Sequence, residues 1–251
     1  MAAGLARTGY RPFVYGLAAF IPIRTVEQIK LDIAHDHLPV VLLGDGAGFV
    51  YSHLGTSHQS TEDISCMRAI PNIEILSPAD RFEMSAAVQY AYQANFPVYL
   101  RMGKSDRGDV HSAPIAATNT KRLLKLRDCK DRRPHIISTG SMAKPALAIA
   151  EQLDLGAWSA LTLKPLHKED VCLIATGSSC IVTIEEHSIH GGLGAAVTEI
   201  TAENIPVRVL RLGVKDVFSQ YCGTYDYLLA EHGLDTESLV ERIVDFCQIS
   251  I

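Results

Sequence analysis

His58 stands among small polar residues in the stretch LGTSHQSTEDISCMRAIPN, residues 54–72. An imidazole titrates near neutrality, so it can both donate a proton to a carbonyl oxygen and accept one from a hydroxyl. Glu62 and Asp63 follow it, and acidic residues are typical of the first turn of a helix. The residues alone leave two interpretations: His58 acts on a bound molecule, or it satisfies the start of that helix.

A second pattern contains residue types that bind metals. Gly-Asp-Gly at 44–46, with Asn72 further along the chain, has the hard oxygen ligands that a divalent cation prefers. The tripeptide follows an apolar run, however, where it is typical of a turn, and Asn72 follows Pro71 at a helix end, where Asn is favoured. The sequence therefore favours a turn at 44–46 over a metal site.

A third pattern is a glycine-rich loop that runs into a helix, HGGLGAAVTE at 190–199. A helix start of this kind can bind phosphate, but the G-x-G-x-x-G spacing and the lysine of a P-loop are both missing. Glycines here favour tight packing of a strand against a helix. Glu185, Glu186 and His187 precede the loop and could form an acid–base set, but a polar strand end is the commoner explanation.

The elements that must position these residues alternate between strand-like and helix-like signals. The apolar run at 38–44 is typical of a strand buried on both faces of a parallel sheet. Such alternation predicts an α/β fold with a parallel sheet. In the first hundred residues, strands are predicted at 12–16, 38–44, 73–76 and 97–102, and helices at 23–38, from Ser60 or Thr61 to Pro71, and from Ser77-Pro78 onward with Met84, Val88 and Ala91 inside.

From Gly103 to about Arg133 the chain turns polar, which predicts a linker, although KRLLKL at 121–126 could add a strand. A second α/β series follows. The segment VCLIATG at 171–177 is ambiguous, because its pattern alone favours a strand. The other elements of this series are strands at 135–139, 180–187 and 207–213 and helices at 144–153 and 193–200.

The composition limits the classes of partner. The chain has 251 residues and a formal charge of −5, and no cluster of Lys and Arg forms a stripe. Neither nucleic acid nor a membrane surface is therefore an expected partner. Six cysteines stand far apart without a C-x-x-C pair, and the first twenty residues resemble no targeting segment. These features predict reduced thiols and a cytoplasmic protein.

Several stretches, in chain order, resemble the transketolase family of thiamine diphosphate enzymes. The match covers nearly the whole chain, so it is more specific than any single motif. It corresponds to the family's pyrimidine-binding and C-terminal domains, whereas the family's diphosphate-binding domain is absent. The stretches are RPFVYGLAAFIPIRTVEQI (11–29), GTSHQSTEDISCMRAIPN (55–72), ILSPADRFEM (75–84), TLKPL (162–166), VTIEEHSIHGGLGAAVTE (182–199), VLRLG (209–213) and HGLD (232–235).

The resemblance implies two three-layer α/β domains with mostly parallel sheets. They are an N-terminally truncated pyrimidine-binding domain at 1–107 and a transketolase C-terminal domain at 134–251, joined by a linker at 108–133. It also implies that 171–177 is helical. Because the family's metal motif belongs to the absent domain, the resemblance assigns no metal ligand in this chain.

The resemblance also implies roles for four residues. His58 matches the family histidine that contacts the sugar and helps to move protons during addition and cleavage. Phe20 matches the aromatic residue that stacks on the aminopyrimidine ring of the cofactor. Arg101 and Lys104 lie where the family places cations for the sugar phosphate, although relatives usually carry Arg at the position of Lys104.

The chain also departs from the family pattern. The family's I-A-E-Q segment, whose Glu protonates the aminopyrimidine, would precede the first residues MAAGLARTGY, so no residue is assigned that role. Leu54 stands where the family has an Asp that contacts substrate hydroxyls, and Gly46 where it has a phosphate-contacting His. These departures predict a substrate that differs from the ordinary pentose phosphates.

The function implied by the resemblance is that of the C-terminal subunit of a split transketolase. It would transfer a two-carbon ketol unit with thiamine diphosphate, in an α2β2 assembly whose N-terminal subunit holds the diphosphate and Mg²⁺ or Ca²⁺. Three alternatives stay open: a deoxyxylulose-phosphate synthase, a two-oxoacid dehydrogenase β subunit, and an inactive fragment that only binds or scaffolds a partner.

Overall fold

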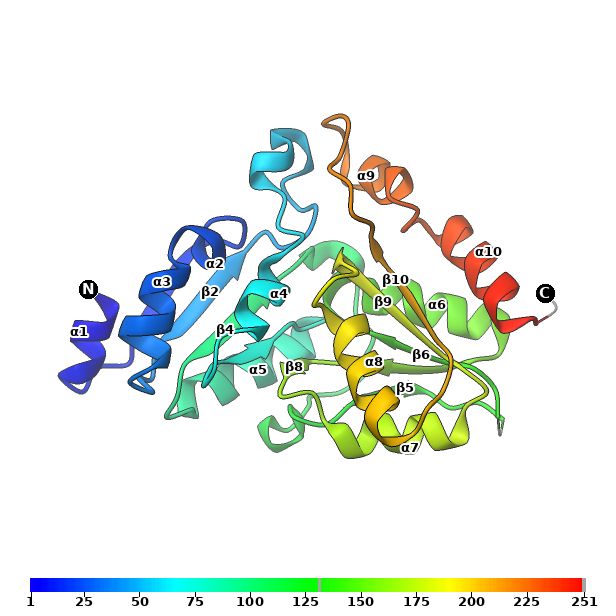
Figure 1. Ribbon diagram of the computed structural model, residues 1–251, viewed down its shortest axis with the longest axis horizontal. Coiled ribbons are helices and arrows are strands. Elements are labelled where there is room, and N and C mark those ends of the chain that lie inside the picture. Colours follow the sequence, from blue (N-terminus) through cyan, green and yellow to red (C-terminus); the bar gives the residue numbers. More distant parts are fainter. Residues whose placement is uncertain (131, 250–251) are drawn as a thin grey trace.

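The computed structural model describes residues 1–130 and 132–249, which form two mostly parallel sheets flanked by helices (Figure 1). In each sheet one edge strand pairs antiparallel with its neighbour, while the other pairings are parallel. The predicted α/β class is confirmed. In spatial order the sheets are β1 (Phe13–Leu17), β2 (Val41–Asp45), β4 (Val98–Met102), β3 (Glu74–Leu76) and β8 (Thr162–Lys164), and then β10 (Val209–Val214), β9 (Ile181–Ser188), β6 (His135–Ser138), β7 (Gly156–Ser159) and β5 (Leu124–Arg127).

The helix predicted at 23–38 forms as three short consecutive pieces. A break falls at Thr25, whose hydroxyl donates to the Ile21 carbonyl and so competes with the regular backbone pattern. The last piece is a π-helix that ends before His37, which has a positive φ of 54°. The helical segments of the first half are α1 (Ala2–Arg7), α2 (Ile21–Arg24), α3 (Val26–Gln28), η1 (Ile29–Ala34), η2 (Ser52–Leu54), η3 (Thr56–His58), α4 (Asp63–Arg68), α5 (Arg81–Gln93), η4 (Ser105–Arg107) and η5 (Ala117–Asn119).

Two predicted helix starts are wrong. Helix α4 begins at Asp63 rather than after Ser60, because Ser60 pairs with Gly48 in an isolated antiparallel bridge. Helix α5 begins at Arg81 rather than at Ser77-Pro78, because the carboxylate of Asp80 accepts from the first free backbone N–H groups of the helix. Val88, predicted to face inward, is 42% exposed.

The second half contains the strand and the helix that the sequence left uncertain. The run KRLLKL contributes β5, and 171–177 belongs to helix α7, as the resemblance implied. His167 caps the start of this helix, because its Nδ1 accepts a hydrogen bond from the Asp170 N–H. The helices of this half are η6 (Gly140–Met142), α6 (Ala143–Leu153), α7 (Lys168–Gly177), α8 (Leu193–Asn204), α9 (Tyr225–Glu231) and α10 (Thr236–Cys247).

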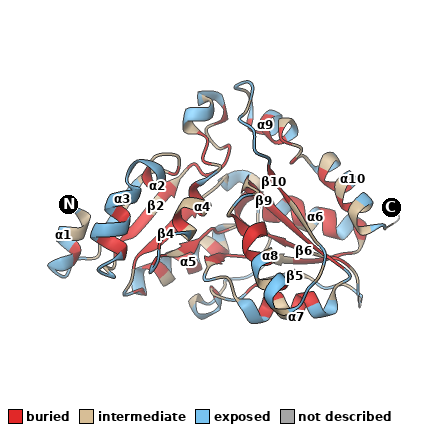
Figure 2. Cartoon of the chain, in the orientation of Figure 1, coloured by how far each residue is buried: buried red, intermediate tan, exposed pale blue. Residues whose placement is uncertain are grey.

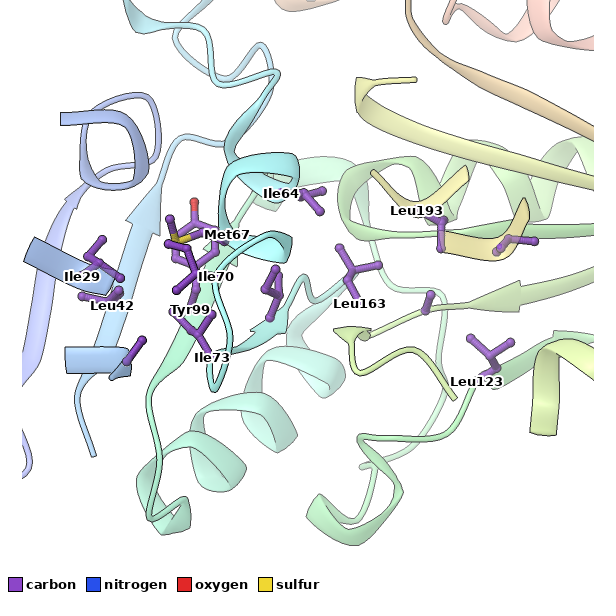
Figure 3. Close-up of a cluster of buried hydrophobic side chains, with 14 of the residues drawn as sticks. Ile29, Leu42, Ile64, Met67, Ile70, Ile73, Tyr99, Leu123, Leu163 and Leu193 are labelled. Carbon is purple, nitrogen blue, oxygen red and sulfur yellow. The ribbon is translucent and has the colours of Figure 1, made fainter. Parts of the chain in front are cut away.

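The two halves are interlocked. Strand β8 belongs to the C-terminal half in sequence but is the edge strand of the first sheet, paired with β3. One hydrophobic cluster contains Ile64 and Met67 together with Leu163 and Leu193, and Figure 3 shows these side chains along the seam. Figure 2 shows that burial is concentrated in the strands and in the inner faces of the helices. The boundaries 1–107, 108–133 and 134–251 stay a prediction.

Within the described residues, no helix combines the length and the hydropathy needed to cross a membrane.

Candidate active site

The candidate site lies at the carboxyl ends of three neighbouring parallel strands. β1, β2 and β4 are in register, so their carboxyl ends meet at one edge of the sheet. Phe20 follows β1, His58 follows β2 and Lys104 follows β4. Ligands of open α/β sheets bind outside this edge, because the diverging connections leave a crevice there.

The structure brings Phe20 and His58 together. Their ring centroids are 5.2 Å apart with an interplanar angle of 65°, an edge-to-face arrangement. Both side chains are half-buried. The Arg24 guanidinium lies 4.1 Å from the Phe20 centroid, and the His58 Nδ1 lies 3.0 Å from the Ser57 hydroxyl. A half-buried aromatic ring beside an imidazole is suited to seat a flat heterocycle next to a group that can move protons.

Arg101 lies inside the protein rather than in the crevice. Its side chain is 2% exposed, and its Nε donates to the Asp63 carboxylate at 2.8 and 3.1 Å. Burial disfavours the charged guanidinium, but Asp63 outweighs that cost and raises the pKa of Arg101. The predicted direct contact of Arg101 with substrate does not fit this position, because its charge is already paired and shielded from solvent.

Lys104, in contrast, lines a cleft of about 480 Å³. Its Nζ lies 2.8 Å from Asp106 and 5.7 Å from the Tyr225 ring centroid. Arg107 shares the cleft and lies 5.5 Å from the same centroid. It was missed from the sequence, because the resemblance assigned roles only to Arg101 and Lys104 among these cations. Asp106 and Asp226 also line the cleft, and Asp226 lies 3.6 Å from Arg107, so each cation is paired with an exposed carboxylate. An anionic group that enters the cleft would have to replace these exposed partners.

Glu185, Glu186 and His187 lie at the end of β9, in agreement with the strand-end explanation, and all three are buried at the seam between the halves. Glu185 accepts from the backbone N–H groups of Leu193 and Gly194, at 2.7 and 2.8 Å, where helix α8 begins. A carboxylate at this position satisfies free donors and faces the positive end of the helix dipole. Glu186 and His187 accept in a similar way from the backbone N–H groups of Phe49 and Ser65, so all three residues are held by structural contacts.

The glycine-rich loop serves close packing, as predicted. A Cβ at Gly192 would lie 2.0 Å from Glu185 Oε2, and one at Gly194 would lie 2.7 Å from the Thr183 hydroxyl on β9. Larger residues would push helix α8 away from β9.

Glu185 makes stability depend on pH. Burial raises its pKa from 4.5 to about 7. Between these values the folded protein keeps a proton that the unfolded chain releases, so its stabilising contribution is complete below pH 4.5 and is lost as the pH rises through about 7. In urea titrations, the difference in unfolding free energy between the wild type and Glu185→Gln is expected to fall by about 2–3 kcal/mol across this window. A difference that does not vary with pH would contradict the assignment.

Comparisons with known proteins agree with this architecture. Residues 1–108 match the transketolase pyrimidine-binding domain, and residues 126–239 match the transketolase C-terminal domain. A Methanocaldococcus jannaschii chain, provisionally named transketolase C-terminal section, is 36% identical over 98% of this chain and 78% of its own length. The 6-deoxy-6-sulfo-D-fructose transketolase subunit of a Clostridium species is 35% identical over 96% of this chain and 75% of its own length.

A solved structure extends the similarity to three dimensions. It is described as a split-gene transketolase in an inactive β4 tetramer, and it is 32% identical with a TM-score of 0.88. The alignment covers 100% of this chain and 80% of that one. With both domain types matched in order and the fold shared over its whole length, this chain belongs to the transketolase family.

Proposed function

We propose that the chain is the C-terminal subunit of a split transketolase that transfers a two-carbon ketol unit from a ketose donor to an aldose acceptor. The observation that carries this proposal is the meeting of Phe20 and His58 at the carboxyl edge of the first sheet, with ring centroids 5.2 Å apart. Thiamine diphosphate, when bound, supplies the carbanion chemistry that transketolases use.

In this proposal the residues of the chain have separate tasks. Phe20 seats the aminopyrimidine ring, since an aromatic face gives a flat heterocycle a dry and oriented surface. His58 donates to the substrate carbonyl oxygen and accepts a proton from a sugar hydroxyl. Lys104 and Arg107 bind the anionic end of the sugar in the cleft beside Tyr225.

An anionic sugar is supported by the relatives. One is named as a 6-deoxy-6-sulfo-D-fructose transketolase subunit and another, from Phocaeicola vulgatus, as an apulose-4-phosphate transketolase subunit. Leu54 and Gly46 replace two polar contacts of the family pattern. We therefore propose a sugar phosphate, or a related anionic sugar, other than the ordinary pentose phosphates.

The surface beside the site supports a partner subunit. Strand β1 is an edge strand, and its Phe13 and Tyr15 are 40% and 65% exposed. Ile23 and Leu31, in the helical segments that follow, are also exposed. An open strand edge and exposed apolar side chains of this kind favour association. We propose that an N-terminal subunit, which holds the diphosphate and Mg²⁺ or Ca²⁺, completes a cytoplasmic α2β2 enzyme.

The test combines the chain with its proposed N-terminal subunit and measures cofactor binding by calorimetry. The assembled wild type is expected to bind thiamine diphosphate and to transfer ketol units, while the chain alone binds it poorly. Phe20→Ala should weaken binding about tenfold or more, since it removes the aromatic seat, and Phe20→Tyr should restore most of the affinity. Submicromolar binding by the chain alone, or full affinity in Phe20→Ala, would contradict the proposal.

A further inference from the structure

The segment that carries His58 is closed at its base. Gly48 and Ser60 exchange two backbone hydrogen bonds of 2.9 Å each, which turns residues 48–60 into a closed loop, here called the His58 loop. Figure 1 shows this loop, which follows β2, facing the connection between β10 and α9 across the top of the molecule. Phe49 follows Gly48 on one side of this base, and Gln59 precedes Ser60 on the other side. Gln59 is also the residue directly after His58.

The Phe49 side is held by the C-terminal half. Phe49 is fully buried, and its backbone N–H donates to the Glu186 carboxylate. The same carboxylate accepts from the hydroxyls of Ser141 and Tyr225. The Phe49 ring stacks on the His232 imidazole, with centroids 4.9 Å apart and an interplanar angle of 15°. This side of the loop is therefore fixed by Glu186 within β9 and by residues that follow β6 and β10.

The Gln59 side is held through a chain of two hydrogen bonds. The Ser219 hydroxyl donates to Gln59 Oε1 at 2.9 Å, so its oxygen is free to accept from His232 Nε2–H, also at 2.9 Å. Gln59 is 5% exposed, so solvent offers little replacement for this bond. His232 thus contacts both sides of the loop base, by stacking on Phe49 and by orienting Ser219.

We propose that Ser219 and His232 are positioning residues, through which the C-terminal domain fixes the placement of the His58 imidazole for proton transfer. The inference rests on the proposed function and assigns the C-terminal domain a part in it. Neither side chain needs to touch substrate. An imidazole displaced by about 1 Å loses much of its effect on the reaction. Lys104 and Arg107, the cations of the neighbouring cleft, lie outside the His58 loop, so they should continue to bind the sugar.

Ser219→Ala in the assembled enzyme is the first test. The variant is expected to lower kcat about tenfold and to change KM for the sugar less than about twofold, because a lost neutral hydrogen bond shifts the loop without removing a binding contact. Ser219→Thr keeps the hydroxyl and should restore kcat. His232→Phe keeps the stack on Phe49 but loses the donor, so it should match Ser219→Ala, and the double variant should be no slower than either.

The matched control is Ser178→Ala, which removes a hydroxyl that donates to the Ile174 carbonyl at the end of α7, outside the His58 loop. It should keep the wild-type kcat. A wild-type kcat in Ser219→Ala, or a loss that Ser219→Thr does not restore, would overturn the inference.

Hydrogen exchange separates this inference from the proposed function. In the full chain, Ser219→Ala should speed amide exchange in residues 49–59 about three- to tenfold, with α5 unchanged as an internal reference. An assembled wild type without ketol transfer would reject the proposed function, and with it the role in proton transfer. Unchanged exchange in residues 49–59 would reject the anchoring itself, whatever the activity.

Discussion

His58→Ala in the assembled enzyme is expected to lower kcat for ketol transfer by about 100-fold or more, the scale of a lost general acid–base group. The imidazole meets Phe20 edge-on at the carboxyl ends of the strands, and alanine leaves no group there to move a proton. Affinity for the cofactor should change little, because the aromatic seat remains. Steady-state assays with saturating sugar, together with calorimetry of cofactor binding, measure the two effects separately.

His190→Ala is the matched control, since His190 is an exposed histidine in the loop before α8. It should leave both kcat and cofactor affinity at the wild-type level. An unchanged rate in His58→Ala would reject the catalytic role and would favour the other interpretation, a histidine that only satisfies local structure.

The largest expected effect on stability is that of Arg101→Ala. The substitution leaves the Asp63 carboxylate, which is 0% exposed, without its cation. Removal of one partner of a buried ion pair costs about 3–5 kcal/mol. The Ser60 and Glu186 carbonyls also lose the donor that they share. Urea unfolding should therefore show a large loss, and the double variant with Asp63→Ala should lose less than the sum of the two single changes.

Lys125→Ala is the control for that experiment, because the Lys125–Asp128 pair is exposed and pairs of this kind contribute little. The same variants decide between two interpretations of Arg101. A residue that contacts the sugar phosphate would raise KM and leave the unfolding free energy unchanged. If Arg101 supports the fold, Arg101→Ala should lower the unfolding free energy and leave KM unchanged.

Most strands could be predicted because each contains a short apolar run between turn residues. β7 and β8 were missed, because GAWS and TLK are too short to show such a pattern. The interior role of Arg101 could not be predicted from the sequence, because it depends on a long-range contact with Asp63. Tyr99 and Arg101 are two residues apart on β4, so they share one face of the strand, and both meet Asp63 from the start of α4. The sequence shows the alternation along β4, but it does not show which helix covers that face.

The candidate site also contains residues that the sequence predicted and one that it missed. Phe20, His58 and Lys104 follow different strands, and their common edge follows from the parallel order of those strands. Arg107 was missed because a cation in a polar stretch carries no local signal of a cleft. Helix α7 was ambiguous because its apolar residues are contiguous, and only the resemblance predicted the helix that the structure shows.

The pairing of β8 with β3 has a consequence for synthesis on the ribosome. The first sheet is finished only after residues 162–164 have left the exit tunnel, since these residues form its last strand. Until then the edge of β3 stays open, and open edges of nascent sheets recruit other chains. A gene cut between the halves would leave that edge open until a separately made chain supplied β8, so translation of the two halves as one unit shortens the time for which the edge is exposed.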